Sequence, residues 1–158
     1  MPIYYFTQDG FTKLESELYT LKTEGRKKVA DQLSEARSKG DLSENAEYDA
    51  AKDAQALLEL KISKIEDKVN NARVLTKNMI DTSKVSILTK VRIKNLKNNM
   101  ELSYGIVSED EANLKEGKIS VGSAIAKGLL GKKINEKAKI TTPAGELEFL
   151  VMDIKSIL

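Results

Sequence analysis

Acidic side chains crowd one short segment of the chain, Gly40–Tyr48, which reads GDLSENAEY. Asp41 and Glu44 stand three residues apart in this segment, and two interpretations of that spacing are open. In the first, Asp41 caps a following helix and Glu44 completes a capping box. In the second, both carboxylates bind a divalent cation, for which oxygen ligands of this kind suit Mg²⁺. Two carboxylates do not enclose a metal ion, so the segment would supply part of a site shared with a phosphate substrate or another protein.

Basic side chains flank the acidic segment, with Arg37 and Lys39 before it and Lys52 after it. They are either ordinary solvated charges, with Glu35 and Lys39 spaced as an i,i+4 ion pair, or contacts to phosphate or RNA. A cation beside nucleic acid adds affinity without reading sequence. Tyr48 also has two interpretations, because it could stack on a base or pack on an Ala-rich helix.

Composition narrows the chemistry that the chain can perform. Its 158 residues include no Cys and no His, which excludes disulfides, thiolate nucleophiles, imidazole bases and the usual zinc sites. Walker, GxGxxG, nucleophile-elbow and HExxH motifs are absent, so nucleotide binding and stand-alone hydrolysis have no support. The net charge is only +2, yet residues 41–53 hold five carboxylates against one lysine, a local charge of −4. Without a signal-peptide pattern or a long apolar run, we expect a soluble, cytoplasmic protein that does not enter a membrane.

Helical periodicity in the first half predicts the element that leads into the acidic segment. Apolar residues recur at spacings of three and four from Gln8 onward, with a shift of phase near Gly25. We expect this helix to follow an N-cap at Thr7 and to end near Ser38, before Gly40, which tolerates a positive φ. Its apolar residues are Phe11, Leu14, Leu18, Leu21, Val29, Leu33 and Ala36.

A second helical pattern begins past Glu44. Two helices of roughly 30 residues each, joined by a short segment around Gly40, must fold back on each other as an antiparallel hairpin. Small residues near the turn would allow the helices to approach closely and form a slim tip. These small residues are Ala46, Ala50, Ala51 and Ala54. The apolar positions of the second helix are Ala51, Ala54, Leu58, Ile62, Ile65, Val69 and Ala72.

The apolar pattern changes to a period of two after residue 78, which predicts half-buried strands of an antiparallel sheet. Thr142–Gly145 (TPAG) lies between two such strands and predicts a hairpin turn, while Ser123–Leu130 (SAIAKGLL) predicts one short helix. We therefore expect an α+β chain with a long helical hairpin at residues 1–78 and a small α+β domain at residues 79–158. The alternating apolar residues are Val85, Ile87, Val91, Ile93, Leu102, Tyr104 and Ile106, and the basic residues expected on the solvent face are Lys90, Arg92 and Lys94.

These features resemble the Gre family of bacterial transcript cleavage factors over nearly the whole chain. The most specific match is the acidic segment followed by Ala50–Lys52, and weaker matches lie at Ile119–Lys132 and Thr142–Gly145. The resemblance implies a coiled-coil hairpin followed by a domain similar to FKBP folds. It also implies a transcription elongation factor that is not itself an enzyme. The second domain would dock at the rim of the secondary channel of bacterial RNA polymerase, and the hairpin would enter the channel.

For individual residues, the resemblance implies that Asp41 and Glu44 help to hold the second Mg²⁺ ion of the polymerase active site, only when docked. A backtracked polymerase would then cleave its own nascent RNA and resume from a new 3′ end. Arg37 and Lys52 align with basic family positions and are assigned to RNA or polymerase contacts. We expect a monomer that binds no cofactor stably by itself. The supporting residues implied for the same contacts are Ser43 and Tyr48.

Two departures from the family pattern lie in the second half of the chain. Gly122–Ala124 stands where an acidic residue, Ser and Pro are usual, and Asn135–Glu136 replaces a common Gly-Asp turn. Both concern loop geometry in the domain that docks, and the acidic segment itself departs very little.

Two other functions compete with transcript cleavage. A related secondary-channel protein would inhibit polymerase by occupying the channel or sequestering its metal, for which bulk negative charge suffices. A structural coiled-coil adaptor or chaperone would use no metal chemistry. The adaptor hypothesis predicts that Asp41→Asn and Glu44→Gln are silent in every polymerase assay.

Overall fold

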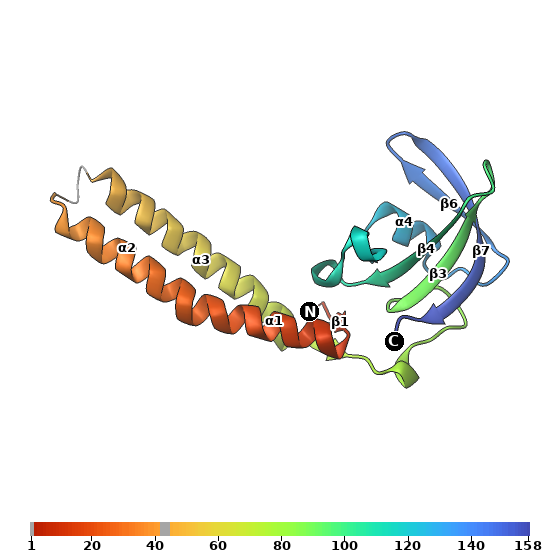
Figure 1. Ribbon diagram of the computed structural model, residues 1–158, viewed down its shortest axis with the longest axis horizontal. Helices are drawn as coiled ribbons and strands as arrows, with labels where there is room; N and C mark the ends of the chain where they lie inside the picture. The colour runs from red at the N-terminus through yellow and green to blue at the C-terminus, as the bar shows by residue number, and fades with distance from the viewer. Residues whose placement is uncertain (1, 42–44) are drawn as a thin grey trace. The chain divides into compact units, whose positions relative to one another are not determined.

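The computed structural model describes residues 2–41 and 45–158, which form two compact units. The first unit holds residues 12–71 and the second combines Pro2–Phe11 with Ala72–Leu158. The expected α+β class is confirmed, because the first unit is helical and the second contains a curled sheet (Figure 1). The predicted first domain ended at residue 78, whereas the strand that follows residue 71 already packs with the second unit.

One arm of the hairpin is a continuous helical rod with a local irregularity. Helix α1 (Gln8–Thr20) leads through a π-helical turn at Leu21–Gly25 into helix α2 (Arg26–Ser38). A π-helical turn contains one more residue than an α-helical one, which explains the shift of phase in the apolar pattern. The predicted cap is confirmed, since the N–H of Gly10 donates to Thr7 Oγ1 at 3.1 Å. The predicted end at Ser38 is also confirmed.

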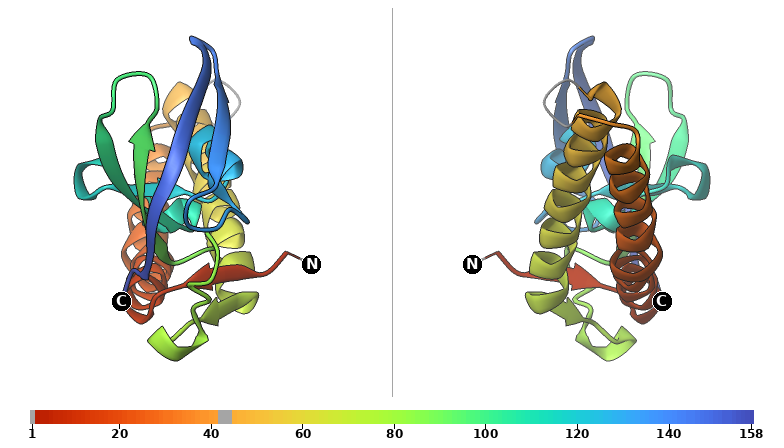
Figure 2. Two further views of the ribbon diagram at one scale, coloured as in Figure 1. Left: turned by 90° about the vertical axis from the view of Figure 1, so that its right-hand side faces the viewer. Right: turned by 90° about the vertical axis from the view of Figure 1, so that its left-hand side faces the viewer.

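The other arm is helix α3 (Ala46–Asn70), which is shorter than the apolar pattern predicted. Ala72 was expected on this helix, but it begins strand β2 (Ala72–Val74). The helix ends because Asn71 leaves the helical conformation, and its side chain donates to the carbonyl of Asp67 at 2.8 Å. Helices α2 and α3 run side by side in opposite directions, as the hairpin prediction required (Figure 2).

The seam between the two arms is narrow. Val29, Leu33 and Ala51 form a small buried cluster against which Tyr48 and Leu58 pack. Ion pairs between the arms border the seam, namely Lys22 with Glu66 at 2.6 Å, Arg26 with Glu59 at 2.9 Å and Lys61 with Glu17 at 3.6 Å. Of the alanines expected to thin the tip, Ala51 is buried, whereas Ala46 and Ala50 are exposed. The close approach therefore depends on Ala36 and Ala51, which are 2% and 5% exposed.

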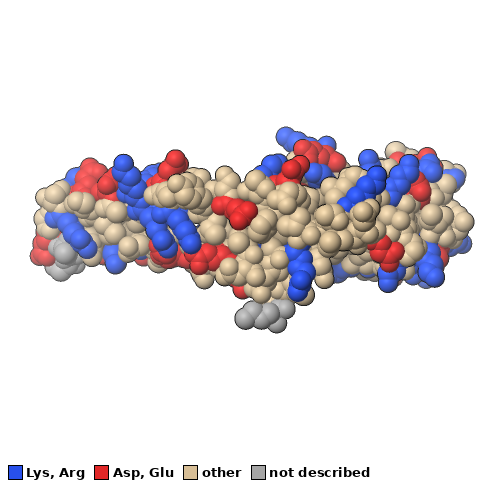
Figure 3. All heavy atoms as spheres, turned by 90° about the horizontal axis from the view of Figure 1, so that it is seen from below, with Lys and Arg blue, Asp and Glu red and all other residues tan. Residues whose placement is uncertain are grey.

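Charged side chains of both signs intersperse along the face of the hairpin seen in Figure 3. This surface is consistent with a helical pair that buries one stripe and leaves its other faces in water. Within residues 2–41 and 45–158, no helix is both long enough and apolar enough to cross a membrane.

The second unit is built on a five-stranded sheet in the order β5-β4-β3-β7-β6. Its pairings are antiparallel, as expected, except for β4 and β5 at one edge, which run parallel. A separate parallel pair joins β1 (Tyr4–Phe6) to β2. The five strands are β3 (Thr89–Asn95), β4 (Glu101–Val107), β5 (Lys118–Ser120), β6 (Lys137–Thr142) and β7 (Gly145–Ser156). Short 3₁₀ turns lie at Lys77–Met79, Glu109–Glu111 and Leu114–Glu116.

Strand β3 begins later than the alternating pattern predicted. Val85 and Ile87 precede the strand, because Leu88 adopts a φ of 64° that interrupts extended backbone. Thr89 Oγ1 donates to the carbonyl of Ser86 at 2.6 Å and holds this turn. The predicted solvent face of the strand is confirmed for Lys90 and Arg92, which are both exposed.

A short helix covers the apolar face of the sheet. Helix α4 (Ala124–Leu129) begins after Ser123, whose Oγ accepts from the N–H of Ala126 at 3.2 Å, as predicted. Ala126 and Leu129 on this helix complete the core of the second unit. The other buried members of this core are Val85, Val91, Ile93, Ile106, Ile119, Ala138, Ile140, Phe149, Val151 and Ile154.

Turn geometry explains why Asn135–Glu136 can replace the Gly-Asp turn that is common in the family. Asn135 adopts a φ of 71°, a left-handed conformation that Asn tolerates better than most residues other than Gly. Its backbone N–H also donates to the carbonyl of Val151 at 2.8 Å. The predicted hairpin turn is confirmed as well, because only Pro143 and Ala144 separate β6 from β7.

Candidate functional site at the end of the helical hairpin

The acidic segment lies where helix α2 gives way to helix α3. Gly40 has a φ of 134°, in the left-handed region that favours glycine, so the chain turns sharply after α2 as predicted. The next residue, Asp41, is exposed. Residues 42–44 lie outside the described part of the chain, so the roles predicted for Ser43 and Glu44 stay predictions.

Asn45, and not Asp41, caps helix α3. Its Oδ1 accepts hydrogen bonds from the backbone N–H groups of Glu47 and Tyr48, each at 3.1 Å. These are two of the N–H groups that lack partners at the start of a helix. The capping interpretation of Asp41 was therefore wrong, because the helix begins at Ala46, immediately after Asn45. The acidic residues Glu47 and Asp49 do occupy the first turn, where the helix dipole favours negative charge.

The same Asn45 side chain also reaches the opposite helix. Its Nδ2 donates to the carbonyl oxygen of Ala36, in the last turn of α2, at 2.6 Å. Sequence reasoning did not single out Asn45. The available signal was its position directly before a helical pattern, where Asn is among the preferred caps.

Arg37 and Tyr48, both candidate contact residues, are brought together across the hairpin. The Arg37 guanidinium carbon lies 5.9 Å from the centroid of the Tyr48 ring, within the range of a cation–π contact. Tyr48 is half-buried and packs on the small apolar cluster of the seam, which supports the packing interpretation. Lys52 lies one turn further along α3, is exposed, and donates to Gln55 Oε1 at 3.2 Å.

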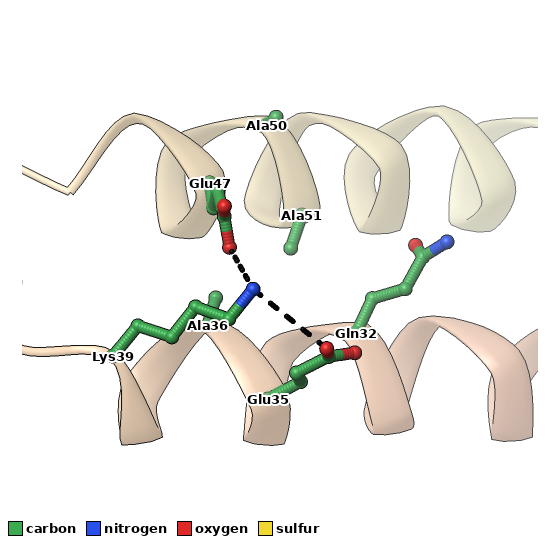
Figure 4. A pocket seen from close by; sticks show the side chains of 7 residues that line it. All are labelled: Gln32, Glu35, Ala36, Lys39, Glu47, Ala50 and Ala51. Carbon is green, nitrogen blue, oxygen red and sulfur yellow. Dashed lines mark ion pairs between the residues drawn. The ribbon is translucent and has the colours of Figure 1, made fainter.

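Lys39 joins the two helices beside a hollow of about 410 Å³ near the tip (Figure 4). Its Nζ lies 3.0 Å from Glu47 Oε2 on α3 and 3.7 Å from Glu35 Oε1 on α2. The predicted i,i+4 pair with Glu35 is thus present, but the contact with Glu47 is shorter. The hydrogen bond to Glu47 is the main reason that the pKa of Lys39 is raised, and Glu35 adds to it. The remaining residues lining the hollow are Gln32, Ala36, Ala50 and Ala51.

The donor atoms at the tip suit a hard cation only in part. Asp41 offers carboxylate oxygens, which match the preference of Mg²⁺. Within the described residues, no three side chains of the His, Cys, Asp and Glu types gather closely enough to hold a metal ion. An ion at this position would need further ligands from residues 42–44, from a partner or from water.

Family models match both halves of the chain. The model described as the N-terminal part of transcription elongation factors, GreA_GreB_N, matches residues 4–74. The model described as the C-terminal part of the transcription elongation factors GreA/GreB matches residues 80–156. Together they cover the hairpin and the sheet.

Individual relatives agree with the family models over 95% of this chain. A protein of Amoebophilus asiaticus named transcription elongation factor GreA is 60% identical over 150 residues, which cover 96% of its length. A protein of Flavobacterium psychrophilum with the same name is 55% identical over 150 residues, which cover 95% of its length. Among solved structures, GreA factor homolog 1 of Thermus thermophilus is 26% identical with a TM-score of 0.45, covering 98% of this chain and all of that one.

Proposed function

Because the chain belongs to the GreA/GreB family of transcription elongation factors, we propose that it enters the secondary channel of bacterial RNA polymerase and stimulates cleavage of backtracked RNA. Elongation factors of this family act on RNA polymerase, and the chain is accordingly an accessory protein. In the proposal, polymerase remains the catalyst. Cleavage removes the displaced 3′ end of the transcript and lets an arrested complex resume.

The form of the hairpin supports this function. Its two arms are antiparallel (Figure 2). Near the tip, the small side chains of Ala36 and Ala51 are buried in the seam between the arms. Two helices joined in this way form a narrow hairpin, and the acidic segment lies at its end. The sheet unit would dock at the rim of the channel, while the hairpin carries the carboxylates inward.

The observation that carries the proposal is the assignment of the helix cap to Asn45. Since Asn45 satisfies the N–H groups at the start of α3, the helix does not need Asp41 as its cap. Asp41 is exposed at the turn, four residues before the cap of α3. We assign Asp41 and Glu44 as ligands that supplement the coordination of the weakly held Mg²⁺ in the polymerase active site. A divalent ion of this kind lowers the pKa of a bound water and orients it for displacement at phosphorus.

Basic side chains beside the tip have a supporting role in the proposal. Arg37 is exposed, and its guanidinium lies over the Tyr48 ring near the acidic segment. Because this contact already restrains the side chain, binding a partner would cost less conformational entropy. Lys52 is exposed on α3 and can approach a phosphate. We assign both to the nascent RNA or polymerase, with Ser43 and Tyr48 as supporting residues.

The test is transcript cleavage in stalled, backtracked complexes of bacterial RNA polymerase with Mg²⁺. The native chain should shorten the RNA, while Asp41→Asn and Glu44→Gln should bind polymerase equally well and cleave at least tenfold more slowly. Asp53→Asn is the matched control, because Asp53 is exposed on α3 further from the turn and loses the same charge. It should cleave at the native rate.

Each alternative function gives a different result in this assay. If the native chain blocks elongation without shortening RNA, and Asp53→Asn weakens the block as much as Asp41→Asn, the inhibitor hypothesis replaces the proposal. If none of the variants changes polymerase activity, the adaptor hypothesis replaces it.

A further inference from the structure

Asn45 makes hydrogen bonds to both helices at the tip through one amide group. Its Oδ1 accepts from the first turn of α3, and its Nδ2 donates to Ala36 in the last turn of α2. The amide orientation follows from these partners, because exchanging O and N would set an oxygen against the Ala36 carbonyl and an N–H group against two others. The side chain is half-buried between the two helices.

Few other side chains can make this set of contacts. Asp, Ser and Thr are also preferred helix caps, but an ionised Asp has no donor and would place a negative charge against the Ala36 carbonyl. Ser has a donor, but its hydroxyl lies one atom closer to the backbone and cannot hold both helices at once. The choice of Asn therefore meets a requirement beyond capping.

Neighbouring contacts join the same turns of the two helices. Lys39 approaches Glu47 at 3.0 Å, and Arg37 lies over the Tyr48 ring. Lys39 and Glu47 are exposed, and ion pairs in water contribute little because solvent and salt screen them. Asn45 is uncharged and half-buried, so salt screens its hydrogen bonds less than it screens these exposed ion pairs.

We propose that Asn45 is a positioning residue for the tip carboxylates. It joins the last turn of α2 to the first turn of α3 and so fixes both ends of the segment that contains Asp41 and Glu44. The inference rests on the proposed function, since it concerns how those carboxylates reach the polymerase active site. A misplacement of about 1 Å costs on the order of 100-fold in rate when catalysis depends on alignment.

The test compares Asn45→Ser and Asn45→Asp, which keep an oxygen cap for α3 and lose the link to Ala36. Asn71→Ser is the matched control, because Asn71 also donates from Nδ2 to a backbone carbonyl, but to Asp67 of its own helix at the other end of α3. We expect the Asn45 variants to lower the maximal cleavage rate about tenfold or more. The factor concentration that gives half-maximal cleavage should not change, and Asn71→Ser should cleave normally.

A measurement of tip geometry separates this inference from the proposed function. The chain has no Cys, so nitroxide labels can be attached at Ser38→Cys and Asp49→Cys, two exposed positions on opposite helices. The distance distribution between the labels should broaden in Asn45→Ser and stay narrow in Asn71→Ser.

Three results would overturn the inference. The first is an unchanged distance distribution in Asn45→Ser, whatever the cleavage activity. The second is a native maximal cleavage rate in both Asn45 variants, and the third is a loss confined to the half-maximal concentration. A native chain that does not stimulate cleavage contradicts the proposed function instead, and the label distances then decide whether Asn45 links the helices.

Discussion

The two units of the chain bury their apolar side chains in different ways. In the second unit, the described residues include one cluster of twelve buried side chains from the sheet, α4 and the segment before β3. In the hairpin, the cluster nearest the tip has three buried side chains, Val29, Leu33 and Ala51. A thick core fixes geometry through packing, whereas a two-helix seam leaves most faces in water. Geometry at the tip therefore depends on individual polar contacts, above all those of Asn45.

The largest expected effect comes from truncating one buried side chain in each unit. Ile140→Ala removes a side chain with 0% exposure from the sheet core and should lower the free energy of unfolding by about 4 kcal/mol. Leu33→Ala in the seam should cost about 2 kcal/mol, because solvent and neighbouring helix side chains can fill the space. Urea titrations of the full chain, followed by hydrogen exchange in peptides from each unit, measure both values. Equal losses in the two units would contradict the contrast in packing.

Glycine replacement should give effects of opposite sign in the two units. A Cβ at Gly128 would lie 2.8 Å from Ile140 Cγ1 and 3.0 Å from the Lys139 carbonyl oxygen, so Gly128→Ala should destabilise by about 1–3 kcal/mol. A Cβ at Gly25 would meet the ends of two side chains, Leu58 Cδ1 at 3.2 Å and Leu21 Cδ2 at 3.9 Å, and the backbone there is helical with φ −64°.

For Gly25→Ala, Leu58 can move aside, so the higher helix propensity of Ala should leave a gain of up to about 0.5 kcal/mol. Thermal melting of the two variants beside the native chain provides the check. A loss of stability in Gly25→Ala as large as in Gly128→Ala would show that the seam packs as rigidly as the sheet core.

The smallest expected effect is electrostatic and belongs to the hairpin. Arg26 donates to Glu59 from Nε at 2.9 Å and from a terminal nitrogen at 3.0 Å. This hydrogen bonding lowers the pKa of Glu59 below its ordinary value of 4.5. A carboxyl group with a lowered pKa stabilises the fold above its unfolded pKa, and the stabilisation is lost as the pH falls through the folded-state value.

Glu59→Gln should therefore lower the melting temperature slightly at neutral pH. The difference from the native chain should shrink as the pH falls below 4.5 and vanish once it is below the lowered pKa of Glu59 in the folded state. Glu15→Gln, at an exposed position on α1, serves as the control for a lost surface charge. A difference for Glu59→Gln that persists in acid would show that Glu59 acts through packing.

Local signals in the sequence predicted much of this fold. The caps at Thr7 and Ser123, the turn at Gly40 and the hairpin after β6 each follow from residues adjacent to the feature they determine. The parallel pairing of β4 with β5 depends on a contact between distant segments, for which the alternating pattern carries no information. Likewise, Val85 and Ile87 fit the alternation, but the positive φ of Leu88 removes them from the strand.

The sequence predicted where the candidate site lies, but not which residue caps α3 or which side chains join the two helices. Asp41 with Glu44 matched the capping-box spacing, and Asn45 was an equally good cap one residue before the helix. Intrinsic preference does not distinguish Asp from Asn at a cap, so the choice depended on where α3 begins. The link from Asn45 to Ala36 and the pair of Lys39 with Glu47 join different helices, and the spacing of residues along one helix does not reveal them.

In the proposed function, Asp41 contributes a ligand to the Mg²⁺ used in transcript cleavage. The most direct measurement is the Mg²⁺ dependence of cleavage by backtracked polymerase, with saturating native chain or Asp41→Asn. Asp41→Asn should need several-fold more Mg²⁺ for half-maximal cleavage, and high Mg²⁺ should restore part of the rate. An unchanged Mg²⁺ dependence, with or without a lower maximal rate, would contradict the claim.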